Sequence, residues 1–139
     1  MNRKIAGLVV ALMIFLANSA YAANWVYYDR VANLHTEYID SATVYKDGNT
    51  LTFWVLQVLD RPLSINYAKQ TLKFEVRLNS PREFRIAESC LYDTKNRPGT
   101  PKINNEPEWE IAEDYDNRQF DFALRYAKKQ KDPGIRPTP

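Results

Sequence analysis

Residue types that could do chemistry are sparse in this chain of 139 residues. His35 is the only histidine and Cys90 the only cysteine. Zinc is usually held by several histidine and cysteine side chains, so a zinc site has almost no ligands to use. A serine or cysteine nucleophile would need His35 as its base, and no spacing in the sequence ties His35 to a serine or to Cys90. We therefore expect no metal, no cofactor and no hydrolase chemistry.

Carboxylates offer a second route to acid–base chemistry, because a pair of them can work without a histidine. Acidic residues are dense in one stretch, at Glu106, Glu108, Glu110, Glu113 and Asp114. Acids around the start of a helix more often form a solvated face that complements the helix dipole. The four glycines form no phosphate-binding motif. The sequence thus favours a protein that is not an enzyme.

A basic strip comes before this acidic stretch. Its cations are Lys69, Lys73, Arg77, Arg82 and Arg85, and they outnumber Glu75 and Glu83. Lys73, Arg77 and Arg85 alternate along two predicted strands, and we take them as the candidate binding surface for a protein or an anionic polymer. The alternative is that the basic and acidic patches complement each other inside one domain.

The N-terminus has the pattern of a secretion signal. Arg3 and Lys4 precede the apolar run 5–16, and small residues follow up to Ala22. We expect cleavage between Ala22 and Ala23, so residues 1–22 are a predicted signal peptide. The apolar run is shorter than the ~20 residues that span a bilayer. No cysteine near the cleavage site could carry a lipid anchor, and the predicted location is the periplasm, the cell surface or the exterior.

Loss of the signal peptide would change the charge balance of the protein. Removal of Arg3 and Lys4 leaves 17 basic residues against 17 acidic ones. A general nucleic-acid-binding role needs a basic excess, so the sequence argues against it. The remaining length suits a single domain of ordinary size.

Runs of β-branched and aromatic residues predict a mostly antiparallel sheet. The predicted strands span residues 25–29, 37–40, 43–46, 50–59, 72–78 and 83–92. Asp47-Gly48 predicts a hairpin between the third and fourth of these. The strand 50–59 is apolar on both faces. We expect it to be central and covered on both sides, either within one chain or by the helix on one side and a partner around Trp54 on the other.

The next two strands carry simpler patterns. Residues 72–78 alternate between apolar and charged side chains, which predicts one buried face and one solvent-exposed face. In the strand 83–92, Phe84, Ile86, Cys90 and Tyr92 share one parity and are expected on one face. Cys90 is expected either buried as a small hydrophobic side chain or free for pairing between chains. Prolines and asparagines in residues 93–107 predict a long loop.

The period changes to that of a helix near the C-terminus. Phe120, Ala123, Leu124 and Ala127 recur at helical spacing, with Asp116 or Asn117 as the expected cap. The sequence Asp132-Pro133-Gly134 is expected to end the helix, which leaves 132–139 as a flexible proline-rich tail. The predicted fold is α+β, an antiparallel sheet with a C-terminal amphipathic helix packed on one face, over residues 23–131.

Several stretches together resemble a known family. They are Trp25, Tyr38-Ile39-Asp40-Ser41, the run 46–56 and Trp109. The chain resembles the surface-adhesin protein E-like family of small exported proteobacterial proteins. The resemblance implies a helix on the concave side of the sheet and, as in characterised members, attachment to host extracellular-matrix and serum proteins.

The same resemblance raises the question of what holds the helix. The family usually ties helix to sheet with a disulfide, and in this sequence Leu78 and the region of Ala127 take the two positions. Burial of apolar side chains is therefore expected to hold the helix alone, because the ~2–4 kcal/mol that a disulfide typically contributes is missing. The side chains concerned are Phe120, Phe122, Leu124 and Tyr126.

These observations lead to a prediction of function with two alternatives. We expect an exported, non-enzymatic binding protein, similar to adhesin E, that recognises a host or envelope protein or an anionic polymer through the sheet face and loop 93–107. The first alternative is a structural or regulatory periplasmic homodimer that buries the Trp54 face against its twin. The second is an enzyme with a cleft lined by Glu108, Glu110 or Asp114.

Overall fold

The computed structural model describes residues 22–61, 67–106 and 108–139. In these residues eight strands form one sheet, and a single helix, α2, follows them in the chain. The elements are β1 (Trp25–Val31), β2 (His35–Asp40), β3 (Tyr45–Asp47), β4 (Thr50–Leu59), β5 (Lys69–Arg77), β6 (Glu83–Tyr92), β7 (Lys102–Ile103), β8 (Glu110–Ile111) and α2 (Asp114–Leu124). The predicted signal peptide lies outside the described residues except for Ala22. No helix in the described parts is long and apolar enough to cross a membrane.

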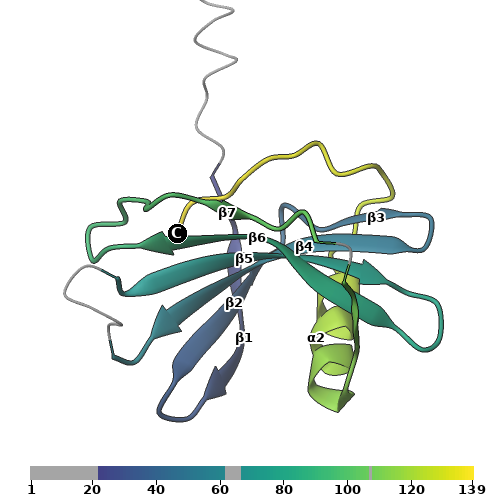
Figure 1. Ribbon diagram of the computed structural model, residues 1–139, viewed down its shortest axis with the longest axis horizontal. Helices are drawn as coiled ribbons and strands as arrows, with labels where there is room; N and C mark the ends of the chain where they lie inside the picture. The colour runs from purple at the N-terminus through teal and green to yellow at the C-terminus, as the bar shows by residue number, and fades with distance from the viewer. Residues whose placement is uncertain (1–21, 62–66, 107) are drawn as a thin grey trace, which may run out of the picture.

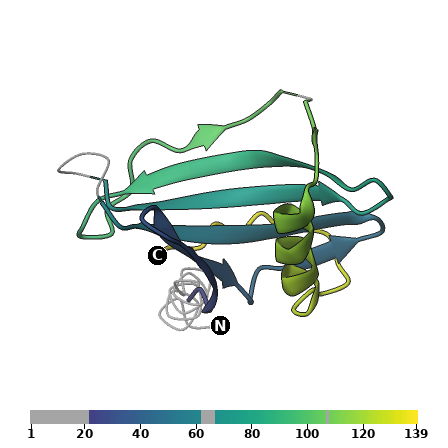
Figure 2. The ribbon, with the colours of Figure 1, turned by 90° about the horizontal axis from the view of Figure 1, so that it is seen from below.

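The sheet is antiparallel and follows the order β1-β2-β4-β5-β6-β7. The short strand β3 pairs with one end of β4, and β8 pairs with one end of β6. Figure 1 shows a curved sheet with α2 on its inner side, and Figure 2 shows α2 running across the strands. The predicted α+β fold, with an antiparallel sheet and a C-terminal helix packed on one face, is confirmed.

The hairpin between β3 and β4 forms where the Asp47-Gly48 pair predicts it. Asp47 pairs with Thr50, so Gly48 and Asn49 make the turn. Gly48 has a φ of +58°, a left-handed conformation that glycine adopts without steric cost. This turn sets the register of β4, the central strand of the sheet.

The strand β4 is covered on both faces within one chain. We call the side packed against α2 the helix face and the opposite side the tail face. Leu51, Phe53 and Val55 are fully buried on the helix face. Trp54 is 2% exposed on the tail face, where the C-terminal segment, residues 128–139, crosses the sheet (Figure 1). The surface that a homodimer was expected to bury around Trp54 is therefore already covered by the same chain.

Phe120 anchors α2 on the sheet. Its ring is fully buried and lies 6.0 Å from the ring of Phe53, 6.4 Å from Phe74 and 5.5 Å from Phe84, measured between centroids. Ala123, one turn later, is also fully buried. Phe122, Leu124 and Tyr126 are partly buried against the same core. The helical stripe seen in the sequence is thus the contact between helix and sheet.

The helix is shorter than the sequence indicates, and both predicted ends are wrong. It begins after Glu113, whose backbone N–H donates to Asp116 at 2.9 Å, so Glu113 is the capping residue in place of Asp116 or Asn117. It ends at Leu124, well before Asp132. Lys128 instead pairs with Tyr45 of β3, and its carbonyl accepts from the N–H of Lys46 at 2.8 Å. Tertiary pairing here overrides helix propensity.

An irregularity in β6 breaks the expected parity of its side chains. Phe74 pairs with Ile86, but the neighbouring Lys73 pairs with Glu88, so Ala87 is an extra residue. An extra residue of this kind moves all later side chains to the other face. Phe84 and Ile86 lie on the helix face, whereas Cys90 and Tyr92 lie on the tail face and are buried there. The burial of Cys90 agrees with the first of its two expected states.

The C-terminal segment is extended, as expected, but it is packed and not free. Its Pro137 is fully buried, and the indole N–H of Trp25 donates to the carbonyl of Thr138 at 3.0 Å. The expectation of a loose tail over 132–139 therefore differs from the structure, in which this segment forms a third layer over the tail face. The molecule therefore has three layers, with the sheet between the helix on one side and the extended segment on the other.

Candidate functional site

The structure separates the three cations of the predicted binding surface. Lys73 lies under the C-terminal segment, with its Nζ 2.5 Å from a carboxylate oxygen of Asp132. The same Nζ is 5.9 Å from the centroid of the Trp54 ring, and the side chain is only 16% exposed. Lys73 is therefore neutralised and covered, and it is not brought together with Arg77 and Arg85.

Arg77 and Arg85 instead converge on Trp109. The guanidinium carbon of Arg77 lies 3.8 Å from the centroid of the Trp109 ring, and that of Arg85 lies 5.3 Å from it. We call these three residues the arginine–tryptophan cluster. Arginine over the face of tryptophan is an attractive cation–π contact. The Arg77 side chain is 53% exposed, and Trp109 is half-buried, so the cluster is open to a partner.

Sheet register and one loop contact place the cluster. Glu75 pairs with Arg85 and Arg77 with Glu83 across β5 and β6, which puts both arginines on the tail face. Each arginine bonds its neighbouring carboxylate, at 2.9 Å from Arg85 to Glu75 and at 3.4 Å from Arg77 to Glu83. Arg85 also donates to the carbonyl of Glu106 at 2.7 Å, which holds the chain that leads to Trp109.

A hollow of about 370 Å³ lies beside the cluster. Arg85, Trp109, Ile86 and Asn104 contribute to its walls. Three exposed glutamates, Glu106, Glu108 and Glu110, also line it. The hollow is therefore more acidic than basic, although two arginines stand next to it. Its charge suits a polar or cationic group better than an anionic one.

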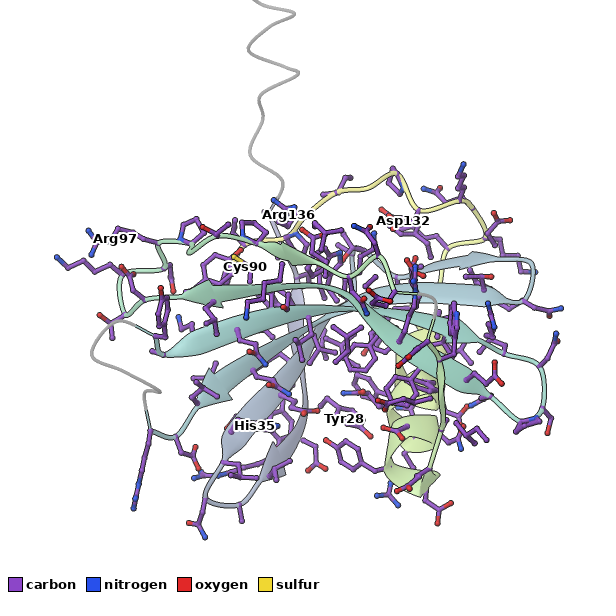
Figure 3. The ribbon with its side chains drawn as sticks, in the orientation of Figure 1. Tyr28, His35, Cys90, Arg97, Asp132 and Arg136 are labelled. Carbon is purple, nitrogen blue, oxygen red and sulfur yellow. The ribbon has the colours of Figure 1, made fainter. Side chains whose placement is uncertain are left out.

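A second convergence of polar side chains lies on the helix face around Glu37. Glu37 is a strand residue only 4% exposed. One carboxylate oxygen accepts from the Tyr115 hydroxyl at 2.8 Å and from Gln119 at 2.9 Å, both on α2. The other lies 2.7 Å from the Nε2 of His35 and accepts from Gln57 at 3.2 Å. Figure 3 shows His35 and Tyr28 on the same side of the sheet as α2.

The bonding around Glu37 suits a structural tie better than catalysis. Four side chains from β2, β4 and α2 contact its two oxygens, so the carboxylate is occupied by groups that the fold holds in place. In the part of the chain that the structure describes, His35 bonds no serine or cysteine side chain. Glu37 therefore joins β2 to α2 through Tyr115 and Gln119, at a different place from Leu78 and the region of Ala127, where the family resemblance implies a disulfide. We expected apolar burial alone to hold the helix. The structure shows that hydrogen bonds to Glu37 also hold it.

The alkaline limit of stability gives a direct test of this network. Burial raises the pKa of Tyr115 well above its usual value of 10.0, and the hydrogen bond to Glu37 and its negative charge raise it further. An unfolded chain would lose the Tyr115 proton near pH 10 while the folded chain keeps it. The unfolded state then binds fewer protons, so the free energy of unfolding falls as the pH rises above about 10, by up to about 1.4 kcal/mol per pH unit for this group.

We expect Tyr115→Phe to reduce this alkaline slope, measured by urea unfolding at several pH values between 9 and 11. Burial also raises the pKa of Tyr28, Tyr45 and Tyr92, so part of the slope will remain. Tyr27→Phe is the matched control, because Tyr27 is exposed. Equal slopes for the two variants would contradict the coupling between Tyr115 and Glu37.

Two of the acids considered for catalysis, Glu108 and Glu110, line the hollow beside the arginine–tryptophan cluster, whereas Asp114 is not among its lining residues. Glu108, Glu110 and Asp114 are all exposed. No group of three or more histidine, cysteine or acidic side chains in the described residues is placed to hold a metal ion. These acids agree better with a solvated face than with a paired catalytic carboxylate.

Sequence reasoning missed Glu37, Tyr115 and Gln119. The available signal was parity, because Glu37 stands between His35 and Ile39 on the side of β2 that faces the core. A carboxylate at an inward position needs partners, so it predicts a buried network. Which residues bond Glu37 depends on where α2 crosses the sheet. The periodicity of a strand gives no information about that position.

Comparison of the chain with protein-family models, with curated proteins and with solved structures gives no match.

Proposed function

We propose that the protein is an exported, non-enzymatic binding protein that recognises another protein at the cell envelope or a host surface. The observation that carries this proposal is the arginine–tryptophan cluster, in which a half-exposed Arg77 stacks on Trp109. Tryptophan and arginine dominate the energetics of protein interfaces, especially when they lie together beside a pocket. The signal pattern in residues 1–22 supports export.

The partner class follows from the charges around the cluster. An anionic polymer would be attracted by free cations, but Arg85 is bonded to Glu75 and Lys73 to Asp132. The hollow beside Trp109 carries three glutamates. This balance favours a protein surface with mixed charges over a uniformly anionic polymer. Surface attachment of the kind implied by the adhesin E-like resemblance agrees with this partner class.

The alternatives have weaker support. Glu37, the deeply buried carboxylate at the helix–sheet contact, is occupied by hydrogen bonds from the protein, which favours binding over catalysis. A homodimer would need a surface other than the one around Trp54, because the C-terminal segment covers that side chain. The proposed function therefore rests on the cluster at Trp109.

Replacing Trp109 with alanine is expected to weaken binding about 30-fold or more, because loss of an interface hot spot costs about 2 kcal/mol or more. The measurement is surface-based binding of purified residues 23–139 to immobilised matrix proteins, envelope protein extract and heparin. Leu34→Ala is the matched control, since it removes an exposed apolar side chain at the turn between β1 and β2, away from the cluster.

Two results would contradict the proposal. One is the absence of saturable binding by the wild-type protein to any protein preparation. The other is equal loss of binding in the Trp109 and Leu34 variants, which would mean that the cluster is not the recognition surface. Strong binding to heparin alone, abolished by salt, would favour the anionic-polymer alternative.

A further inference from the structure

Among the described residues, backbone hydrogen bonds join the C-terminal segment to the sheet at only one point, around Lys128. The N–H of Lys46 donates to the carbonyl of Lys128 at 2.8 Å, and the N–H of Lys128 donates to Val44 at 3.0 Å. Beyond this point, within the described chain, no backbone hydrogen bond joins residues 131–139 to a strand. Figure 3 shows Asp132 and Arg136 on the segment above the sheet. The rest of the segment must be held by side chains.

In the part of the chain that the structure describes, two ion pairs, one buried proline and one hydrogen bond do this. Asp132 pairs with Lys73, and Arg136 pairs with Glu88. Pro137 is fully buried. Last, the indole N–H of Trp25 donates to the carbonyl of Thr138 at 3.0 Å.

This combination is that of a receptor for a proline-containing peptide. Grooves that bind such peptides bury proline rings and use aromatic side chains, and the peptide, already extended, loses little entropy on binding. The indole N–H is a donor that needs an acceptor, and a carbonyl next to a proline is free to accept. The sequence Arg136-Pro137-Thr138-Pro139 supplies the ligand side of this arrangement.

The receptor side is carried by paired strands of the sheet. Lys73 pairs with Trp54 on one side and with Glu88 on the other, so these side chains form one row across β4, β5 and β6. Trp25 lies in β1 at the edge of the sheet. The register of these strands is set by their own backbone pairing, in which the segment takes no part.

We propose that the tail face is a peptide-binding groove, occupied in this chain by its own C-terminal segment. The partner it fits is an extended segment of another protein with an arginine followed by proline, and with a carboxylate four residues before the arginine. Lys73 binds the carboxylate, Glu88 the guanidinium, and Trp25 a backbone carbonyl. This groove is separate from the cluster at Trp109, so the inference stands or falls independently of the proposed function.

The intramolecular segment competes with any such partner at an effective concentration in the millimolar range. A test must therefore weaken the segment without changing the groove. Asp132→Ala combined with Arg136→Ala in the full chain removes both ion pairs of the segment and leaves Trp25, Lys73 and Glu88 in place. The probe is a fluorescein-labelled peptide with the sequence of residues 130–139.

We expect saturable binding of this peptide to the double variant by fluorescence anisotropy, at least tenfold tighter than to the wild-type protein. A peptide carrying Arg136→Glu should not bind the double variant. Adding Glu88→Lys to the double variant should abolish binding of the original peptide and restore binding of the one with Arg136→Glu.

Three outcomes would overturn the proposal. The first is no saturable binding to the double variant at peptide concentrations up to about 1 mM, the range set by the competing segment. The second is equal binding of the original and the charge-reversed peptides. The third is a wild-type dimer in light scattering that the double substitution converts to monomer, because the groove would then serve exchange of segments between two copies.

Discussion

Replacing Glu37 with alanine is expected to lower the free energy of unfolding by about 3 kcal/mol or more. The substitution leaves four donor side chains without their shared acceptor. Two of these donors, Tyr115 and Gln119, lie on α2. Gln119 is itself buried, so its amide would lose its partner without gaining water. The measurement is urea unfolding at neutral pH, followed by circular dichroism, with the slope against urea concentration checked for a change in cooperativity.

Glu83→Ala is the matched control for this prediction. Glu83 is also a strand glutamate, but it pairs with Arg77 at 3.4 Å on a partly exposed surface. Exposed ion pairs contribute about 0–1 kcal/mol, so its loss should be small. Glu37→Gln should fall between the two, because it retains one carbonyl oxygen as an acceptor. If Glu37→Ala costs no more than Glu83→Ala, then Glu37 does not tie the helix to the sheet.

The Glu37 network explains how the helix is held without a covalent link. Apolar contact alone resists separation of helix and sheet but allows sliding, because it is not directional. Hydrogen bonds from Tyr115 and Gln119 to one carboxylate fix the position of α2 along the sheet. The chain has a single cysteine, so no disulfide within it can link helix and sheet, and the directional contacts come from this network.

Local patterns were sufficient to predict most of the sheet. The strong alternation in β5, the two-sided apolar run of β4 and the Asp47-Gly48 turn each depend on neighbours within a few residues. The structure places β4 at Thr50–Leu59 and β6 at Glu83–Tyr92, the ranges expected from the sequence. Such features follow from side-chain period and turn chemistry, and both can be recognised from neighbouring residues in the sequence.

Features that depend on distant contacts could not be predicted in this way. The extra residue at Ala87 changes the face of Cys90. No proline or glycine near Ala87 in the sequence indicates this irregularity. The end of α2 at Leu124 depends on the pairing of Lys128 with β3, about 80 residues earlier in the chain. Both are consequences of tertiary fit, and periodicity within one element contains no information about it.

The candidate site also depends partly on local patterns and partly on contacts with distant parts of the chain. Parity placed Lys73, Arg77 and Arg85 on one face, and the register confirms that shared face. Which of these cations remain available depends on segments that arrive from elsewhere. Asp132 from the C-terminal segment covers Lys73, whereas Trp109 from the loop before β8 stacks on Arg77. Charge counted along the sequence therefore overestimates the free positive charge of the surface.

Replacing Phe120 with alanine is expected to cost about 3–5 kcal/mol of unfolding free energy. Its ring is fully buried among Phe53, Phe74 and Phe84, so the substitution leaves a cavity at the centre of the helix–sheet contact. Domains of this size are stable by only about 5–15 kcal/mol, so the variant would lose a large part of its stability. Thermal and urea unfolding of the purified variant provide the measurement.

Phe122→Ala separates anchoring at Phe120 from general loss of aromatic surface on α2. Phe122 contacts Tyr28 and Tyr126 at centroid distances of 5.1 Å and 5.7 Å, but it is only partly buried. Its loss should cost roughly half as much, because part of the ring already touches water in the folded state. Equal costs for the two variants would mean that the helix is held by its whole apolar side and not by one buried ring. That result would leave the position of α2 along the sheet to the hydrogen bonds at Glu37, since diffuse apolar contact is not directional and does not fix it.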